Sequence, residues 1–394
     1  MNVEPFLHLD LETASICVVV SCCLLLGLAQ RAGARGGIGA SALFAIAAAL
    51  ATISLRADIA LVTLGAACLV QASFCYRVTH IGAIGLAVAG VCTALAGWLH
   101  GSGAQEWAFI LSVIALVIRV GPWPAHLAMS RLTTRAMGEH VRQLGMLMPL
   151  LFVHLRYLDH LDLAVTWSVP MVQVGACSML VGGLASLGAP TLGRFFMLSS
   201  SVHGAIIFMA CGAAGAGHEA AALFAGITAC VATGGLGAVV EAVRRRAGER
   251  SLLVAGGLSH SMPRLAALFL LFGGAGLGLP ATAGFVADDL MLHALWQESP
   301  VSTVLVIFAN ALLIIATWWA ATRVFFGKDA NRDIDDARFT DRVLASACLI
   351  VLLVLGFAPR LVLDPSLALL KANPANGIVG QQGEGTVETQ DVLP

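Results

Sequence analysis

Residues 276–292 read GLGLPATAGFVADDLML and lie in a long apolar run between about Leu265 and Leu295. The run is long enough to cross a bilayer as a helix, which needs about 20 mainly apolar residues. Pro280 has no backbone N–H and interrupts a helix, and the glycines of the stretch loosen the turns around it. A helix interrupted at membrane depth exposes backbone polar groups that need neighbouring protein or water. The stretch therefore predicts a discontinuous membrane helix.

Two adjacent carboxylates, Asp288 and Asp289, follow this interruption inside the same apolar run. A charged side chain near the bilayer centre costs roughly 2.5–3.5 kcal/mol on insertion scales, so such residues usually mark a partner or a pathway. Together with the broken helix, the carboxylates favour an ion path through the membrane. The alternative is a proline-kinked packing helix whose aspartates lie at the membrane interface.

The whole chain is hydrophobic and poor in charge. Apolar residues make up 58% of it and charged residues 11%, whereas a soluble domain carries about 25% charged residues. A chain of 394 residues with this composition is predicted to be an all-α polytopic membrane protein surrounded by the lipid bilayer. Its net charge of −1 gives no indication of nucleic-acid binding. The first residues are acidic, which does not fit the basic start of a cleaved signal peptide.

The ten cysteines lie mostly inside apolar runs, and no CxxC pair or Cys/His cluster has the spacing of a metal site. The sequence also contains no P-loop and no dinucleotide-binding fingerprint. We therefore expect no metal and no cofactor. Redox catalysis by this chain alone is not expected, and at most the chain is a non-redox subunit of an enzyme.

Apolar segments recur along the chain and predict a bundle of about twelve transmembrane helices, two of them discontinuous. The segments are residues 13–29, 38–55, 59–75, 81–99, 107–121, 137–155, 163–187, 195–213, 219–241, 264–295, 301–322 and 342–358. Residues 371–394 differ because they are polar, glycine-rich and acidic. This composition predicts a disordered tail after a transmembrane domain of residues 1–370.

The distribution of basic residues predicts the orientation. If the N-terminus lies outside, 17 of the 22 Lys and Arg residues fall in loops on the cytoplasmic side, and 4 fall in the outer loops and the tail. Cytoplasmic loops of membrane proteins carry an excess of these residues. The sequence therefore predicts a protein of the cell inner membrane with both termini on the periplasmic side.

A second interrupted segment lies earlier in the chain. Arg119 ends an apolar run, and Pro122 and Pro124 follow it within the sequence VIRVGPWPAH. Broken helices in separate halves of a chain are typical of transporters built from repeats. The alternative is an interfacial arginine whose apolar stem extends to the lipid headgroups.

Three further residues are candidates for a proton path. His126 follows the first break, His203 lies early in an apolar span, and Arg142 lies near the start of another helix. An imidazole can relay protons because its ordinary pKa of about 6.5 is close to neutrality. Each histidine is equally consistent with a structural hydrogen bond, and Arg142 with a pair at a helix entrance.

Three stretches resemble the antiporter-like membrane subunits of respiratory complex I (types L, M and N) and their relatives in Mrp antiporters and membrane hydrogenases. GLGLPATAGFVADDLML is similar to the family's second broken helix and VIRVGPWPAH to its first. LGRFFMLSSSVHGAIIF is similar to a segment with a basic residue, Tyr-Ser-Ser and a His or Gln. The similarity covers roughly residues 1–330. It implies a longer helical bundle, here shortened at its N-terminus, that works beside other membrane subunits of a respiratory-type complex.

The resemblance also implies a site. In the family, a buried glutamate and a row of buried lysines are thought to pass protons along a water-filled axis. Here the glutamate position falls at Ala67 and two lysine positions fall at Arg119 and near Thr233. Arg142 stands at a basic or histidine position, and Asp288 at the charged position of the second broken helix. An arginine stays protonated, because its pKa is above about 12, and cannot hand on a proton.

Three functions remain open at this point. The first is a membrane subunit that takes part in proton translocation, with Asp288 as the exchanging group and Arg119 as a fixed counter-charge. The second is a structural scaffold subunit that has lost the proton path. The third is the membrane part of a proton-coupled inorganic-carbon uptake system, which would need a zinc-carrying partner.

Overall fold

The computed structural model describes residues 44, 46, 47, 57–76, 79–122, 125, 126, 137–158, 161–213, 218–254, 256–327 and 335–361. Within these residues the chain forms helices joined by turns and loops, with one isolated β-bridge between Thr191 and Ser251. The predicted all-α class is confirmed. Most of the two N-terminal candidate spans and the whole of the 371–394 tail lie outside the described residues, so the number of twelve spans stays a prediction.

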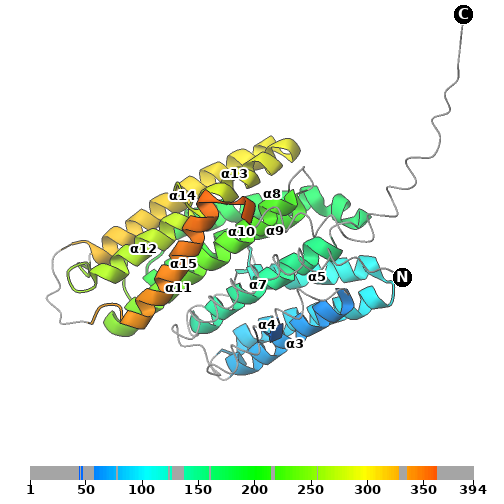
Figure 1. Ribbon diagram of the computed structural model, residues 1–394, viewed down its shortest axis with the longest axis horizontal. Helices are drawn as coiled ribbons and strands as arrows, with labels where there is room; N and C mark the ends of the chain where they lie inside the picture. The colour runs from blue at the N-terminus through cyan, green and yellow to red at the C-terminus, as the bar shows by residue number, and fades with distance from the viewer. Residues whose placement is uncertain are drawn as a thin grey trace, which may run out of the picture.

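Three helices form the N-terminal side of the bundle, shown in blue and cyan in Figure 1. They are α3 (Ala57–Tyr76), α4 (His80–Gly101) and α5 (Gln105–Val120). α3 and α4 pack closely, since a β-carbon at Gly65 would lie only 2.7 Å from the carbonyl oxygen of Gly90. Small residues permit this close backbone approach in membrane bundles.

The middle of the chain forms the centre of the bundle. Its helices are α7 (Met137–Tyr157), α8 (Asp162–Leu187) and α9 (Leu192–Gly212). α9 is almost fully buried, whereas about half of α8 is exposed. A helix that is apolar on all sides belongs in such a buried position, and α9 is therefore placed to contact several neighbouring helices.

The last part of the chain completes the bundle (Figure 1). Its elements are α10 (His218–Thr228), a π-helix (Ala229–Thr233), α11 (Gly234–Ala247), α12 (Pro263–Gly276), α13 (Ala283–Glu298), α14 (Pro300–Phe325) and α15 (Phe339–Phe357). α10, the π-helix and α11 follow one another without a break, and α15 crosses in front of α11 and α12 in the figure.

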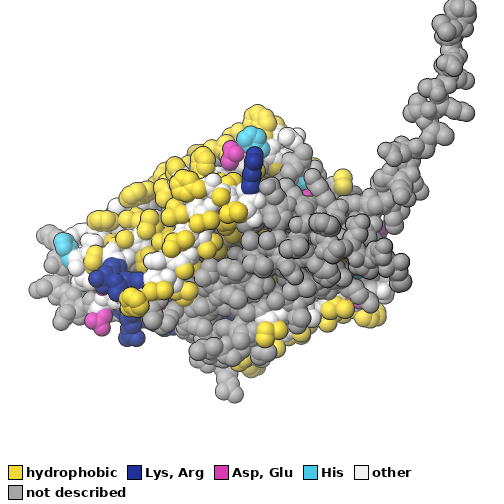
Figure 2. All heavy atoms as spheres, in the orientation of Figure 1, with side chains coloured by type: hydrophobic (Ala, Val, Ile, Leu, Met, Phe, Trp, Pro, Cys, Tyr) yellow, Lys and Arg dark blue, Asp and Glu magenta, His cyan; other side chains and the backbone are white. Residues whose placement is uncertain are grey.

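Six of the described helices are long and apolar enough to cross a membrane. They are residues Ala57–Tyr76, His80–Gly101, Leu163–Leu187, Leu192–Gly212, Ala221–Ala247 and Pro300–Phe325. Figure 2 shows hydrophobic side chains over much of the described part of one face. The side chains of Val301, Phe308 and Trp318 on α14 are exposed. Soluble monomers rarely expose contiguous apolar patches of this kind. The protein is therefore embedded in a membrane.

The helix boundaries follow the apolar segments closely. The segment 163–187 corresponds to α8 and the segment 301–322 to α14, each within about three residues. The run 264–295 is divided between α12 and α13, as the glycines and Pro280 of this run predict. The π-helix at Ala229–Thr233 was not predicted.

Candidate functional site

The first break lies at the end of α5. Gly121 has φ 68° and ψ 44°, a left-handed conformation that glycine adopts readily, and its N–H donates to the Val117 carbonyl. Pro122 then follows and cannot continue the helix. Arg119 lies in the last turn of α5 and is only 2% exposed. A cation at this end of a helix interacts favourably with the helix dipole.

Helix α9 packs against the first break. The hydroxyl of Ser201 donates to the carbonyl oxygen of Gly121 at 2.6 Å. One turn further along, a β-carbon at Gly204 would lie 2.2 Å from the carbonyl oxygen of Val120. The hydrogen bond satisfies a carbonyl at the helix end, and the glycine lets the two backbones touch.

The second break separates α12 from α13. α12 ends at Gly276, and Thr282 precedes the first residue of α13. In the turn between them Gly278 has φ 77° and Ala281 has φ 70°. Ala281 is the one non-glycine residue with positive φ among the described residues, and this conformation costs an L-residue roughly 1–2 kcal/mol. The predicted discontinuous helix is confirmed, with a tight and strained turn at the break.

α9 also contacts the second break. Nε2 of His203 lies 2.9 Å from the carbonyl oxygen of Gly276, and Nδ1 lies 2.8 Å from that of Ser199 on its own helix. The imidazole is buried. Ser201 and His203 are two residues apart, so a short piece of α9 contacts the end of α5 and the end of α12.

Asp288 lies beside the second break, one turn into α13. Its carboxylate extends over the turn, because a β-carbon at Gly278 would lie 2.6 Å from Asp288 Oδ2. Asn310 of α14 donates from Nδ2 to the same oxygen at 3.0 Å. Asn310 was missed in the sequence, although a lone amide inside the apolar segment 301–322 is a usable signal.

Asp289 points in another direction. Its side chain is exposed and lies 3.6 Å from Nδ1 of His293, one turn along α13. Neighbouring helix residues differ by about 100° around the axis. The two aspartates, treated together in the sequence, therefore occupy different environments.

The remaining candidates lie on other elements. Arg142 is buried on α7, and its guanidinium carbon lies 5.1 Å from the Phe44 ring centroid. Close to it in sequence, Nε2 of His140 lies 2.8 Å from the hydroxyl oxygen of Ser200 on α9. The serine run of α9 therefore contacts α7 as well as the first break.

His126 is half-buried beside the first break. It lines a partly open cavity of about 420 Å³ together with Arg194 and Ser201. Arg194 lies in the first turn of α9, so the cavity extends from the arginine-bearing end of this helix to the serine that bonds Gly121. His126 and the first break thus share one space.

His203 lines a second, narrow gap with Thr233, Phe272 and Thr317. The gap is too tight to admit a water molecule. Thr233 ends the π-helix, and such helices are frequent at functional sites. Passage of water past His203 therefore requires movement of these side chains.

The comparison with known sequences identifies the family. Residues 86–313 match the family model described as NADH:quinone oxidoreductase/Mrp antiporter, TM. The chain belongs to this family. Among its relatives, NADH-quinone oxidoreductase subunit M of Rhodobacter capsulatus is 26% identical over 302 residues, which are 71% of this chain and 56% of the relative. The chain spans about half the length of the curated relatives it matches.

Chains of two solved membrane complexes have the same fold. A chain of respiratory complex I from Thermus thermophilus with bound NADH superimposes with a TM-score of 0.76 at 18% identity, over 92% of this chain and 85% of that one. A chain of the Mrp complex from Dietzia sp. gives a TM-score of 0.77 at 16% identity, over 92% and 44% of the two chains. The resemblance drawn from the three sequence stretches is confirmed.

Proposed function

We propose that the chain is a membrane subunit of a complex I-like or Mrp-type multi-subunit assembly and takes part in proton translocation. One observation supports this above the others: α9 hydrogen-bonds to both helix breaks, through Ser201 to Gly121 and through His203 to Gly276. Unwound backbone and polar side chains are costly at membrane depth. Polar side chains and helix ends are concentrated along one central helix, and this arrangement fits a polar route across the bundle better than a purely structural role.

Asp288 is the proposed exchanging group. A carboxyl group can take up and release a proton, and this one is half-buried with a single described donor, the amide of Asn310. Asp289 faces away from the break and is exposed, so we assign the exchange to Asp288. The turn at Gly278 leaves room for the Asp288 carboxylate because glycine has no side chain.

The other candidates have different proposed roles. His203 is the proposed relay, because its imidazole can exchange a proton and lies beside the second break, two residues from the serine that contacts the first. Arg119 and Arg142 are fixed positive charges, since a guanidinium does not release its proton. His126 lies in the cavity that leads to the first break and is the proposed entrance group.

The surroundings of the chain follow from the same proposal. The partners are other membrane subunits, as the names of the relatives and of the solved complexes suggest. The chain lies in the cell inner membrane with both termini on the periplasmic side, in agreement with the excess of basic residues in the opposite loops. Residues 1–370 form the transmembrane domain and residues 371–394 a polar tail.

The test compares two neighbouring aspartates. The chain, purified with its bound partner subunits, is reconstituted into liposomes, and proton flux is measured for wild type, Asp288→Asn and Asp289→Asn. We expect Asp288→Asn to reduce the flux at least tenfold and Asp289→Asn to leave it within a factor of two. Equal flux in wild type and Asp288→Asn would remove Asp288 from the path. Absence of flux in all three would favour a scaffold subunit, and co-purification of a zinc-carrying subunit would favour carbon uptake.

A further inference from the structure

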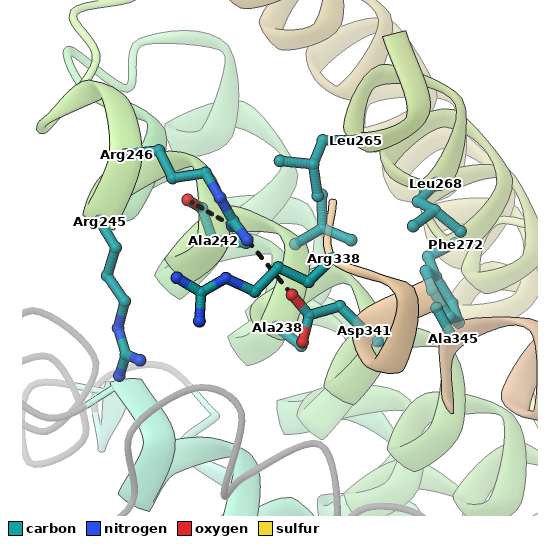
Figure 3. A pocket seen from close by; sticks show the side chains of 12 residues that line it. Ala238, Ala242, Arg245, Arg246, Leu265, Leu268, Phe272, Arg338, Asp341 and Ala345 are labelled. Atoms are coloured by element: carbon teal, nitrogen blue, oxygen red, sulfur yellow. Dashed lines mark hydrogen bonds and ion pairs between the residues drawn. The ribbon is translucent and has the colours of Figure 1, made fainter. Parts of the chain in front are cut away.

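A cavity of about 400 Å³ lies where α11 ends and where α12 and α15 begin (Figure 3). Three arginines, Arg245, Arg246 and Arg338, line it near its opening. Leu265 and Leu268 of α12 form part of an apolar inner wall. The cavity thus combines a basic opening with an apolar interior, and none of the proposed proton-path residues lines it.

The opening carries a net positive charge. Asp341 is the one carboxylate among the described residues that line the cavity, against three arginines, and Arg245 also pairs with Glu241 of the same helix, Nε to Oε1 at 2.8 Å. Arg246 is held in place by Asp341, with Nη2 and Oδ2 3.2 Å apart, and by the carbonyl of Ala242. Arg338 is exposed and points toward Arg246 (Figure 3), and the structure gives it no ion pair within the described residues. The opening therefore favours an anion.

The guanidinium groups indicate which anion fits. Arginine presents paired N–H donors that match the oxygens of a phosphate. Arg246 and Arg338 come from different helix ends, and both side chains line the same cavity (Figure 3). An anion between them would contact α11 and the start of α15 together.

The apolar wall indicates what the anion is attached to. The α12 side chains that line the cavity extend from Leu265 to Phe272, and Ala238 and Val239 of α11 lie opposite. Seven helical residues correspond to about 10 Å along the axis. Inorganic phosphate would use only the opening, whereas an amphiphile would place its anionic head there and an apolar chain along this wall.

The place of the cavity in the bundle fits a lipid. The ends of three helices meet there, at one end of the membrane-crossing part. Figure 2 shows Lys and Arg side chains grouped at one end of a surface on which many described side chains are hydrophobic. Basic pockets between transmembrane helices are suited to anionic headgroups on the cytoplasmic side, the side to which the basic loops assign this end.

We propose that this cavity binds an anionic phospholipid. The lipid phosphate contacts Arg246 and Arg338, and one acyl chain lies against Leu265 and Leu268. Inorganic phosphate and a phospholipid headgroup both offer phosphate oxygens to the arginines, and we assign the cavity to the membrane lipid.

The proposal is tested with the full chain in detergent. Native mass spectrometry measures binding of phosphatidylglycerol, of phosphatidylcholine and of inorganic phosphate. We expect the double variant Arg246→Gln/Arg338→Gln to bind phosphatidylglycerol about 30-fold more weakly, because each arginine near an anionic surface contributes a factor of about five. The matched control, Arg264→Gln/Arg323→Gln, removes the same charge near the same end from residues that do not line the cavity. It should bind within a factor of two of wild type.

A second variant tests the apolar wall separately. Ala242→Phe keeps all three arginines and places a ring in the cavity, so it should weaken phosphatidylglycerol binding about tenfold. Equal binding of phosphatidylcholine and phosphatidylglycerol would overturn the proposal, and so would an equal loss in the control. Displacement of the lipid by inorganic phosphate, with no effect of Ala242→Phe, would assign the opening to free phosphate. A partner subunit found seated over the three arginines in the native assembly would also overturn it.

Discussion

Nε2 of His203 lies 2.9 Å from the carbonyl oxygen of Gly276, the last residue of α12. Nδ1 of the same ring lies 2.8 Å from the Ser199 carbonyl oxygen. A neutral imidazole has one N–H and can donate to one of these oxygens, whereas the protonated ring can donate to both. The contact therefore connects the protonation of a buried histidine to the end of a broken helix.

Substitution of His203 separates its structural role from its proposed relay role. His203→Leu leaves the partly buried Gly276 carbonyl without its donor, which costs about 1–3 kcal/mol. His203→Gln can retain one donation but cannot exchange a proton. We expect His203→Gln to unfold within a few degrees of wild type in a detergent thermal melt and to lose most of the proton flux. Wild-type flux in His203→Gln would show that the histidine is structural.

The contact between α5 and α9 predicts a strong steric effect. In Gly204→Ala the new β-carbon would lie 2.2 Å from the Val120 carbonyl oxygen, so the backbones must separate. Overpacking costs about 1–3 kcal/mol, and a rigid backbone neighbour places this variant near the upper value. We expect a lower thermal midpoint and displacement of the Gly121 break from Ser201.

Gly274→Ala is the matched control for that variant. Its β-carbon would meet only the Leu279 side chain, at 3.6 Å, which is an ordinary contact. Alanine inside a helix is about 0.5–1 kcal/mol more favourable than glycine. The two glycine variants should therefore shift the midpoint in opposite directions, and a similar loss in both would contradict the close contact at Gly204.

The sequence predicted where α5 and α12 end because the cause is local. Gly121, Pro122 and Pro280 disrupt a helix regardless of what surrounds it. The Asn310–Asp288 hydrogen bond was not predicted, because residues 22 positions apart are brought together only by the packing of α14 on α13. The bond from Ser201 to Gly121 spans 80 residues and could not be predicted for the same reason.

Two further features show other limits of sequence reasoning. The adjacent aspartates could have been separated, since helical geometry places neighbours about 100° apart, but the sequence does not tell which one faces the break. The π-helix before Gly234 has no proline or other local signal, because its extra residue is accommodated by contacts in the core. Family resemblance added an expectation that periodicity could not give, namely that the two breaks belong to one site.

The strained turn at the second break can be relaxed by glycine. Ala281 has φ 70°, and a left-handed conformation costs an L-residue roughly 1–2 kcal/mol. Ala281→Gly removes this cost, although glycine loses more entropy on folding. We expect a net gain of about 0.5–1 kcal/mol, measured as a higher thermal midpoint. Ala267→Gly, at an exposed position inside α12, makes the same chemical change in a regular helix and should cost about 1 kcal/mol. A loss in both variants would show that Ala281 is not strained.

Ser201 provides the last prediction, because its hydroxyl bonds a different helix. In Ser201→Ala the buried carbonyl of Gly121 loses this donor, which costs about 1–3 kcal/mol and loosens the first break. Ser186 is the control: it is also buried, but its hydroxyl donates to Gly182 one turn back on α8, at 2.7 Å. Such intrahelical bonds contribute little to stability, so Ser186→Ala should change the free energy of unfolding by less than about 1 kcal/mol. Hydrogen–deuterium exchange should rise at the end of α5 in Ser201→Ala and stay unchanged there in Ser186→Ala. Equal exchange at α5 in both variants would mean that α9 does not hold the first break.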